Sequence, residues 1–154
     1  MKTVLFLCSG NYYRSRFAEL LFNHLVMQRD LAWRAISRGL ALELRVNNPG
    51  PISRFTIMGL AARGVALDAE VRGPLALDHS DLLSAQHIVA VNRAEHLPML
   101  ERKFPHRVKQ VEFWDVHDLD MASADKALGQ LERKVTQLID RLHRLGARSS
   151  RVEG

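Results

Sequence analysis

Hydrophobic and polar positions along the chain form two alternating patterns. Short apolar runs bounded by polar residues indicate buried strands, whereas apolar residues three or four positions apart indicate helices. Strands are predicted over residues 4–7, 32–37, 86–91 and 108–111. Helices are predicted over residues 14–28, 53–63, 93–103 and 124–145, with a helical turn over 81–85. This alternation predicts an α/β fold with helices on both faces of a parallel sheet, and a site beyond the carboxyl ends of the strands.

The first and last predicted helices carry apolar stripes that indicate how they pack. In the first helix the stripe consists of Phe17, Leu20, Leu21 and Leu25. In the last helix it consists of Leu128, Leu131, Val135, Leu138, Leu142 and Leu145. The last helix also carries basic residues that we interpret as a solvated face, namely Arg133, Lys134, Arg141, Arg144 and Arg148.

Length and composition limit the class of protein. With 154 residues, 47% of them hydrophobic, the sequence predicts one globular domain over residues 1–154, with a disordered tail over the last few residues. No apolar stretch reaches the length of a membrane span, so we expect a cytoplasmic protein without a membrane partner. The single cysteine excludes an intramolecular disulfide and disfavours a multi-cysteine metal site. The net charge of +5 favours anionic partners, but the basic residues lack the interleaved aromatics of a dedicated nucleic-acid-binding surface.

The only cysteine, Cys8, follows the first predicted strand, and a polar loop separates it from Arg14 at the start of the first predicted helix. A loop that closes on a helix N-terminus directs several backbone N–H groups at one spot, which suits a phosphate-sized anion. Arg14 would bind two oxygens of that anion. Gly10 and Asn11 tolerate the left-handed backbone that a tight loop needs. The predicted phosphate-binding residues are Ser9, Gly10, Asn11, Tyr12, Tyr13, Arg14 and Ser15.

Cys8 would lie beneath this anion as a candidate nucleophile. The loop N–H groups and Arg14 would stabilise its thiolate for phosphoryl transfer. Ser15 would cap the helix or donate a hydrogen bond to the sulfur that stabilises it as a leaving group, and the two roles are compatible. A free cysteine is more often a small buried hydrophobe, but the strand, loop and helix around Cys8 favour the catalytic interpretation. A lipoprotein acylation site is excluded, because the bulky Leu7 occupies a position that needs a small residue.

Residues 8–15, Cys-Ser-Gly-Asn-Tyr-Tyr-Arg-Ser, resemble the signature C-x-G-N-x-C-R-S-P of the low-molecular-weight protein tyrosine phosphatases. Weaker similarities follow in the family's order: residues 37–39 to S-A-G, 60–65 to L-x-x-x-G-I, 85–92 to A-D-L-I-L-V-M-D and 114–118 to W-x-V-x-D. The resemblance implies a flavodoxin-like three-layer sandwich with a four-stranded parallel sheet, and catalysis without a metal or another cofactor.

The resemblance also implies a two-step phosphatase reaction. Cys8 attacks phosphorus to form a phosphocysteine, Arg14 holds the phosphoryl oxygens, and Asp118 matches the family's general acid. Asp115 and Asp120 are near enough in sequence to remain alternatives. The implied substrate is a phosphotyrosine protein, which in bacterial relatives is often a tyrosine kinase. Three residues match supporting residues of the family: Asn11, Ser15 and Ser37. Asn11 would brace the loop, and Ser37 would form a hydrogen bond with Asn11.

Some residues of the family pattern are replaced in the loop and beside the acid. Tyr13 stands in place of the second loop cysteine, so the family's protective disulfide cannot form. Arg16 and Leu119 replace two prolines, and we expect the second change to make the acid loop more mobile.

The rim and the supporting residues also differ from the family. The aromatic residues of the family's pocket rim are absent, and Tyr12 would either supply a substitute wall or narrow the entrance. Asn92 replaces an acidic residue, and a histidine that braces the loop in the family is replaced near Glu70.

Three other functions would use the same loop. Arsenate reduction needs further thiols, which this chain would have to take from an external thiol such as glutathione. Phosphoarginine hydrolysis is disfavoured, because relatives with that activity carry a small threonine at the position of Tyr12. A phospho-ligand-binding module without turnover fits the altered rim, whereas the retained Cys8, Arg14, Ser15 and Asp118 favour an enzyme.

Overall fold

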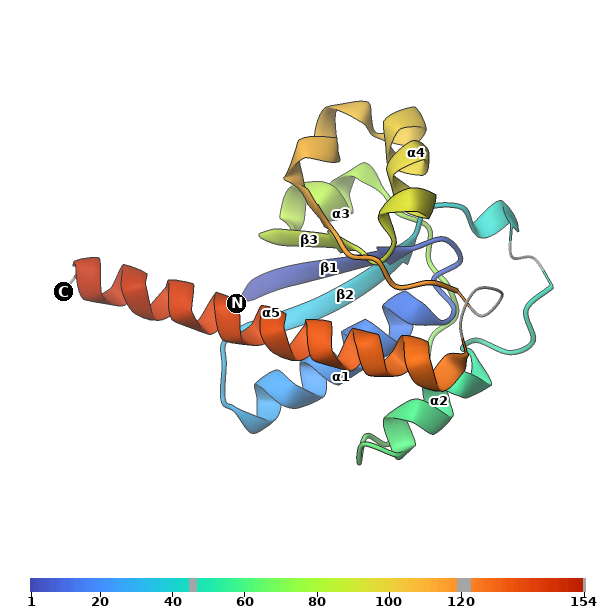
Figure 1. Ribbon diagram of the computed structural model, residues 1–154, viewed down its shortest axis with the longest axis horizontal. Coiled ribbons are helices and arrows are strands. Elements are labelled where there is room, and N and C mark those ends of the chain that lie inside the picture. The colour runs from blue at the N-terminus through green and yellow to red at the C-terminus, as the bar shows by residue number, and fades with distance from the viewer. Residues whose placement is uncertain (45–46, 119–122, 154) are drawn as a thin grey trace.

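The computed structural model describes residues 1–44, 47–118 and 123–153. Its centre is a four-stranded parallel sheet with the order β2-β1-β3-β4 (Figure 1). The strands are β1 (Lys2–Cys8), β2 (Trp33–Gly39), β3 (His87–Ala90) and β4 (Val111–Phe113). The helices are α1 (Arg14–Gln28), α2 (Arg54–Ala61), α3 (His79–Ser84), α4 (Arg93–Lys103) and α5 (Ala124–Glu153), with 3-10 segments η1 (Leu42–Leu44) and η2 (Pro105–Gln110). The predicted flavodoxin-like three-layer fold is confirmed.

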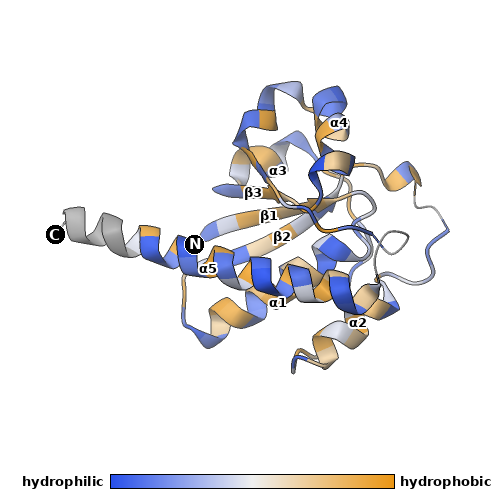
Figure 2. Cartoon of the chain, in the orientation of Figure 1, coloured by the Kyte–Doolittle hydropathy of each residue, from blue (hydrophilic) through white to orange (hydrophobic). Residues whose placement is uncertain are grey.

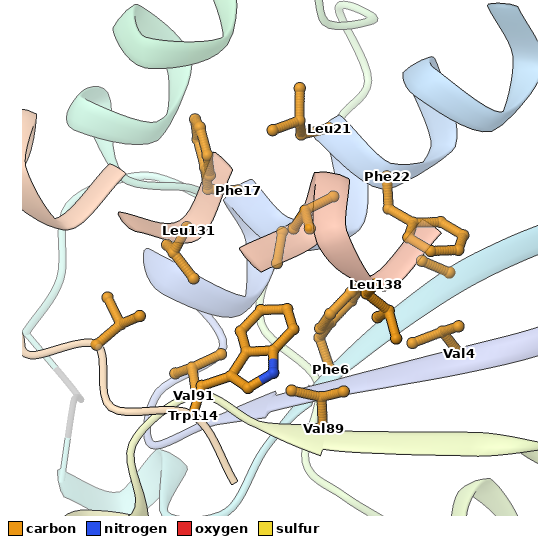
Figure 3. Packing of buried hydrophobic residues seen from close by; sticks show 14 of the residues in the cluster. Val4, Phe6, Phe17, Leu21, Phe22, Val89, Val91, Trp114, Leu131 and Leu138 are labelled. Atoms are coloured by element: carbon orange, nitrogen blue, oxygen red, sulfur yellow. The ribbon is translucent and has the colours of Figure 1, made fainter. Parts of the chain in front are cut away.

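Each face of the sheet has its own hydrophobic core, because successive residues of β1 point to opposite faces. Phe6 faces α1, α2 and α5, whereas Leu5 and Leu7 face α3 and α4. In the first core, shown in Figure 3, the Phe6 ring lies 5.9 Å from Phe22 and 5.7 Å from Trp114. Burial on both faces explains why β1 is apolar along almost its whole length.

The helix stripes are only partly as predicted. In α1, Phe22 and Val26 are buried in place of Leu20 and Leu25, which are only partly buried, because the helix packs against both the sheet and α5. The stripe of α5 is buried except for Leu145, whose side chain is 58% exposed. The reason is that α5 runs past the edge of the sheet, and its backbone stays helical to Glu153 through the segment predicted to be a disordered tail (Figure 1). Figure 2 shows the mixture of hydrophilic and hydrophobic positions along this helix.

The fourth strand begins later in the chain than predicted. Pro105 starts η2, which holds residues 105–110 outside the sheet, and pairing with β3 begins only at Val111, opposite Ile88. Val108, predicted as strand, packs from η2 against the second core. The sequence prediction was wrong here because a short apolar run fits a strand and a 3-10 turn equally well.

The sheet order places a switch point at the carboxyl ends of β1 and β3. The chain leaves β1 through α1 toward β2 on one side, while β3 and β4 lie on the other side. In open α/β sheets this is where ligands bind. Cys8 ends β1 at this point, and α4 starts there just after β3. Within the described residues, no helix is long and apolar enough to cross a membrane.

Candidate active site

The loop after β1 presents backbone N–H groups to one side. Cys8 is 3% exposed, and Asn11 has the left-handed backbone predicted for the loop, with a φ of 49°. Within the described chain, no backbone carbonyl accepts a hydrogen bond from the N–H groups of residues 9–13, so these donors remain available for an anion. Four loop carbonyls instead accept hydrogen bonds from flanking segments: those of Cys8, Ser9, Tyr12 and Tyr13, from Leu40, Ala41, Ser53 and Thr56 respectively.

β2 approaches this loop so closely that only glycine fits at its end. A Cβ atom on Gly39 would lie 2.8 Å from the Ser9 carbonyl oxygen and 3.1 Å from the Asn11 nitrogen. The backbone of β2 therefore fixes the height of the loop above the sheet.

The Ser15 hydroxyl contacts the candidate nucleophile. Ser15 Oγ lies 2.8 Å from Cys8 Sγ and accepts a hydrogen bond from Asn11 Nδ2 at 2.9 Å. Because a hydroxyl has one proton, Ser15 can donate that proton to the sulfur. The N-cap of α1 is Tyr13, which makes no side-chain cap bond. Of the two roles predicted for Ser15, the helix cap is wrong and the sulfur contact is present.

The Asn11 amide is held in one orientation by long-range contacts. Its Oδ1 accepts hydrogen bonds from Arg72 Nη1 and from the Leu75 N–H, both at 3.0 Å. Its Nδ2 donates to Ser37 Oγ at 2.9 Å, as the family resemblance implied. Two donors on the oxygen require the amide nitrogen to face Ser37 and Ser15.

Arg72 occupies the bracing position, slightly later in the chain than the sequence indicated. Its Nη2 lies 2.9 Å from Glu19 Oε1 and 3.1 Å from both the carbonyl and the hydroxyl oxygen of Ser37. The Ser37 hydroxyl donates to the same Glu19 oxygen at 2.7 Å. The fully buried Arg16 donates to the Arg72 carbonyl at 2.7 Å, and burial, together with Arg72, lowers the pKa of Arg16 to about 10. Two arginines that depart from the family pattern thus connect α1 with the segment around residue 72.

Glu95 holds one end of the buried Arg14 guanidinium. Arg14 Nη1 and Nη2 donate to the two Glu95 oxygens at 2.8 and 3.0 Å, and Nη1 also donates to the Val116 carbonyl at 2.8 Å. These contacts use three of the five guanidinium N–H groups. The Nε–H and the second Nη2–H lie along the adjacent edge, which is suited to two phosphoryl oxygens. Although burial opposes it, the hydrogen bond to Glu95 and the neighbouring Cys8 raise the pKa of Arg14 above its ordinary value.

Asp118 is the carboxyl group that the structure brings to this edge of Arg14. Its Oδ2 lies 3.6 Å from Arg14 Nη2, and its side chain is 16% exposed. Asp118 lines a pocket of about 80 Å³ together with Cys8 and Arg14. Asp115 is exposed and lines a different groove. Asp120 lies outside the described residues.

Two tyrosines are among the residues that line the pocket. The Tyr12 hydroxyl donates to the Pro49 carbonyl at 2.6 Å, which ties the loop to the segment that contributes Asn48 to the pocket. The Tyr13 ring lies 6.4 Å from Phe55 and is buried. Burial, reinforced by the charge of Asp118, raises the pKa of Tyr13 to about 12. Tyr13 therefore stays neutral at any physiological pH.

The first turn of α4 supplies groups that sequence analysis missed. Asn92 Oδ1 accepts from the Glu95 N–H at 3.0 Å and caps the helix, and Glu95 supplies the carboxylate for Arg14. His96 Nδ1 accepts from the Asn92 N–H at 3.2 Å, so Nε2 carries the proton that is donated to Ser9 Oγ at 3.1 Å. Burial, reinforced by the Arg14 charge, lowers the pKa of His96 to about 3 and keeps it neutral. The start of the helix could have been predicted from an Asn followed three residues later by Glu directly after a strand, but this pattern does not reveal the contact with Arg14.

Residues 3–147 match the family model of the low molecular weight phosphotyrosine protein phosphatases. The chain belongs to this family. It is accordingly a cysteine-dependent phosphatase, as the sequence predicted, and it has a single cysteine. No curated protein matches the chain significantly.

Solved structures of family members have the same fold. A low molecular weight protein tyrosine phosphatase from T. tengcongensis is 24% identical, with a TM-score of 0.75 over 92% of this chain and 99% of that chain. Vibrio vulnificus Wzb in complex with benzylphosphonate is 16% identical, with a TM-score of 0.76 over 91% and 98%. The YwlE arginine phosphatase from Geobacillus stearothermophilus is 20% identical, with a TM-score of 0.74 over 96% and 97%.

Proposed function

We propose that this phosphatase hydrolyses phosphotyrosine in proteins, with Cys8 as nucleophile, Arg14 as phosphate ligand and Asp118 as general acid and base. The observation that carries the proposal is the arrangement around the pocket. Cys8 Sγ, 2.8 Å from the Ser15 hydroxyl, shares the pocket with Asp118 and with the edge of Arg14 that Glu95 leaves available.

In the first step the Cys8 thiolate attacks phosphorus, and the S–P bond forms as the bond to the leaving oxygen breaks. Asp118 gives its proton to that oxygen, so the alcohol leaves neutral. The N–H groups of the loop and the Arg14 edge bind the phosphoryl oxygens, whose charge they stabilise in the transition state. In the second step Asp118 takes a proton from water, the water oxygen attacks phosphorus, and the S–P bond breaks to release phosphate and the thiolate.

The choice of an aryl phosphate is supported by the pocket walls. Tyr12 and Tyr13 line the pocket, in place of the rim aromatics that the family has and this sequence lacks. Wzb, with a related fold, is solved with benzylphosphonate, in which a methylene group joins an aromatic ring to a phosphonate. As finer parts of this proposal, the protein acts in the cytoplasm and its substrate is a bacterial tyrosine kinase. Cell fractionation and a substrate-trapping pull-down with Cys8→Ser test these two parts.

A second candidate, phosphoarginine hydrolysis, is motivated by the arginine phosphatase with the same fold. The bulky Tyr12 ring, tied to Pro49, occupies wall space and counts against it. Arsenate reduction would need an external thiol, because the chain has no second cysteine.

Turnover of p-nitrophenyl phosphate and of phosphotyrosine, phosphoserine and phosphoarginine peptides tests the proposal. We expect phosphotyrosine to be preferred, and a phosphocysteine on Cys8 to be trapped by rapid acid quench and mass spectrometry. Asp118→Asn should lower kcat by about two to four orders of magnitude, whereas the matched control Asp115→Asn should change it little. Activity that survives Cys8→Ser would contradict the assignment. Phosphopeptide binding without turnover would show a binding module, and arsenate-dependent consumption of glutathione would show a reductase.

A further inference from the structure

A second groove, separate from the pocket, lies between the start of α4, the segment that follows β4, and α5. It has a volume of about 540 Å³. Its floor is apolar and accessible: Leu97 and Phe113 are half-buried, and Pro98 is exposed. The full set of lining residues is Arg93, Ala94, Leu97, Pro98, Phe113, Trp114, Asp115 and Lys134.

Positive charge dominates this groove. Arg93 and Lys134 are exposed, and neither lies within ion-pairing distance of a carboxylate in the described part of the chain. Stacking on Phe113, 5.2 Å from the ring centroid, holds the Arg93 guanidinium at the groove wall. Among the described residues that line the groove, Asp115 is the only acidic one, so two cationic side chains face one carboxylate. The groove thus combines an apolar floor with two cations available to an outside anion.

The groove is built from the same two segments that hold Arg14. The Arg93 N–H donates to the Trp114 carbonyl at 2.9 Å, which joins the start of α4 to the acid-bearing segment. Two residues further along each segment, Glu95 and the Val116 carbonyl hold Arg14. Asp115, which lines the groove, precedes Asp118 by three residues, and three residues of extended chain span about 10 Å. The groove therefore begins within about 10 Å of Asp118 along this segment. A polypeptide in the pocket can therefore reach the groove within a few residues of its phosphorylated side chain.

We propose that this groove binds the part of the phosphoprotein substrate next to the phosphotyrosine, and that it selects a segment with an acidic and an apolar side chain within about four residues of it. The inference rests on the proposed function. Charge complementarity argues for this occupant: the groove presents two cationic side chains against one carboxylate, neither cation is ion-paired within the described chain, and the whole chain carries a net charge of +5. The apolar floor formed by Leu97, Pro98 and Phe113 would bind the apolar side chain.

Steady-state kinetics with matched phosphotyrosine peptides test the inference. Three peptides are compared: one with Asp and Leu before the phosphotyrosine, one with both after it, and one with Ser and Ala throughout. The wild type should favour one acidic peptide over the neutral peptide by about fivefold in kcat/KM, the scale of two exposed charge pairs. The double variant Arg93→Gln, Lys134→Gln should lose this preference and keep wild-type turnover of p-nitrophenyl phosphate.

The control double variant Arg102→Gln, Lys109→Gln removes the same net charge from exposed positions outside the groove, and it should retain the peptide preference. If both double variants lose the preference equally, general electrostatic attraction accounts for it and the groove is not a binding site. Equal kcat/KM for all three wild-type peptides would also overturn the inference. A dimer that the groove variant abolishes would assign the groove to a second copy and overturn it as well. If the wild type turned over no aryl phosphate at all, the proposed function itself would fail.

Discussion

Replacing Arg72 tests whether the contacts beneath the loop matter for catalysis as well as for stability. Arg72→Met removes the hydrogen bonds to Asn11, Glu19 and Ser37, and the Glu19 side chain, 13% exposed, loses its cation. One of the two donors that fix the Asn11 amide also disappears, so the amide can rotate and withdraw its nitrogen from Ser15. The Ser15 proton is then no longer directed at Cys8.

The size of the effect follows from burial. Arg72 is 33% exposed, so water replaces part of what is lost, and we expect a decrease of about 2–3 kcal/mol in the free energy of unfolding. For a chain of this size that corresponds to a Tm lower by roughly 5–10 °C. Loss of the amide orientation should in addition lower kcat for p-nitrophenyl phosphate by about tenfold or more, since a misplaced nucleophile is costly.

Thermal denaturation and steady-state kinetics are measured together, with Arg63→Met as the matched control. Arg63 pairs with Glu132 at 3.1 Å and, within the described residues, makes no hydrogen bond or ion pair with the loop after β1, so this variant should lose stability but keep kcat. Arg72→Lys should recover part of the kcat of the methionine variant, because its charge still pairs with Glu19. If Arg72→Met behaved like Arg63→Met, with a lower Tm and an unchanged kcat, the reasoning about the Asn11 amide would be refuted.

Three further predictions follow from single contacts. The pKa of His96 is about 3 in the folded protein and near 6.5 in the unfolded chain, so between these pH values only the unfolded chain binds the extra proton. The free energy of unfolding should therefore fall by about 1.4 kcal/mol for each unit of decreasing pH in that window. Urea denaturation at about pH 7 and about pH 5 should show a smaller difference in the free energy of unfolding for His96→Gln than for the wild type. Gly39→Ala should lower kcat, because its Cβ would lie 2.8 Å from the Ser9 carbonyl and displace the loop; unchanged phosphate inhibition and kcat would contradict this. Leu138→Ala, in the fully buried stripe of α5, should cost about 2–5 kcal/mol in chemical denaturation and leave KM unaffected.

The catalytic loop could be predicted from the sequence because its parts are local. Cys8, Arg14 and Ser15 lie within eight residues, and the strand and helix around them fix how the loop must close. Asp118 came from the family resemblance, and the structure brings it, rather than Asp115, to the pocket. These residues needed no knowledge of tertiary packing.

The partners of these residues could not be predicted, because they arrive from distant parts of the chain. Glu95 and Arg72 are 81 and 61 residues away from the groups they hold, and nothing in their local sequence marks them as partners. The same limit explains the errors in the fold. Leu145 fits the apolar stripe of α5 but lies beyond the edge of the sheet and is exposed. Val108 packs against the second hydrophobic core from a 3-10 segment and is not part of a strand.

The Glu95–Arg14 pair has a consequence for the end of the reaction. A buried guanidinium with no counter-ion would bind a phosphate dianion very tightly, and inorganic phosphate would be slow to depart. Because the carboxylate already balances the guanidinium charge, Arg14 offers well-placed donors without a surplus of positive charge. Arg14 can therefore recognise the phosphoryl group through its hydrogen-bond donors without the strong charge attraction that would retain the phosphate product. Once phosphate leaves, the enzyme can accept its next substrate.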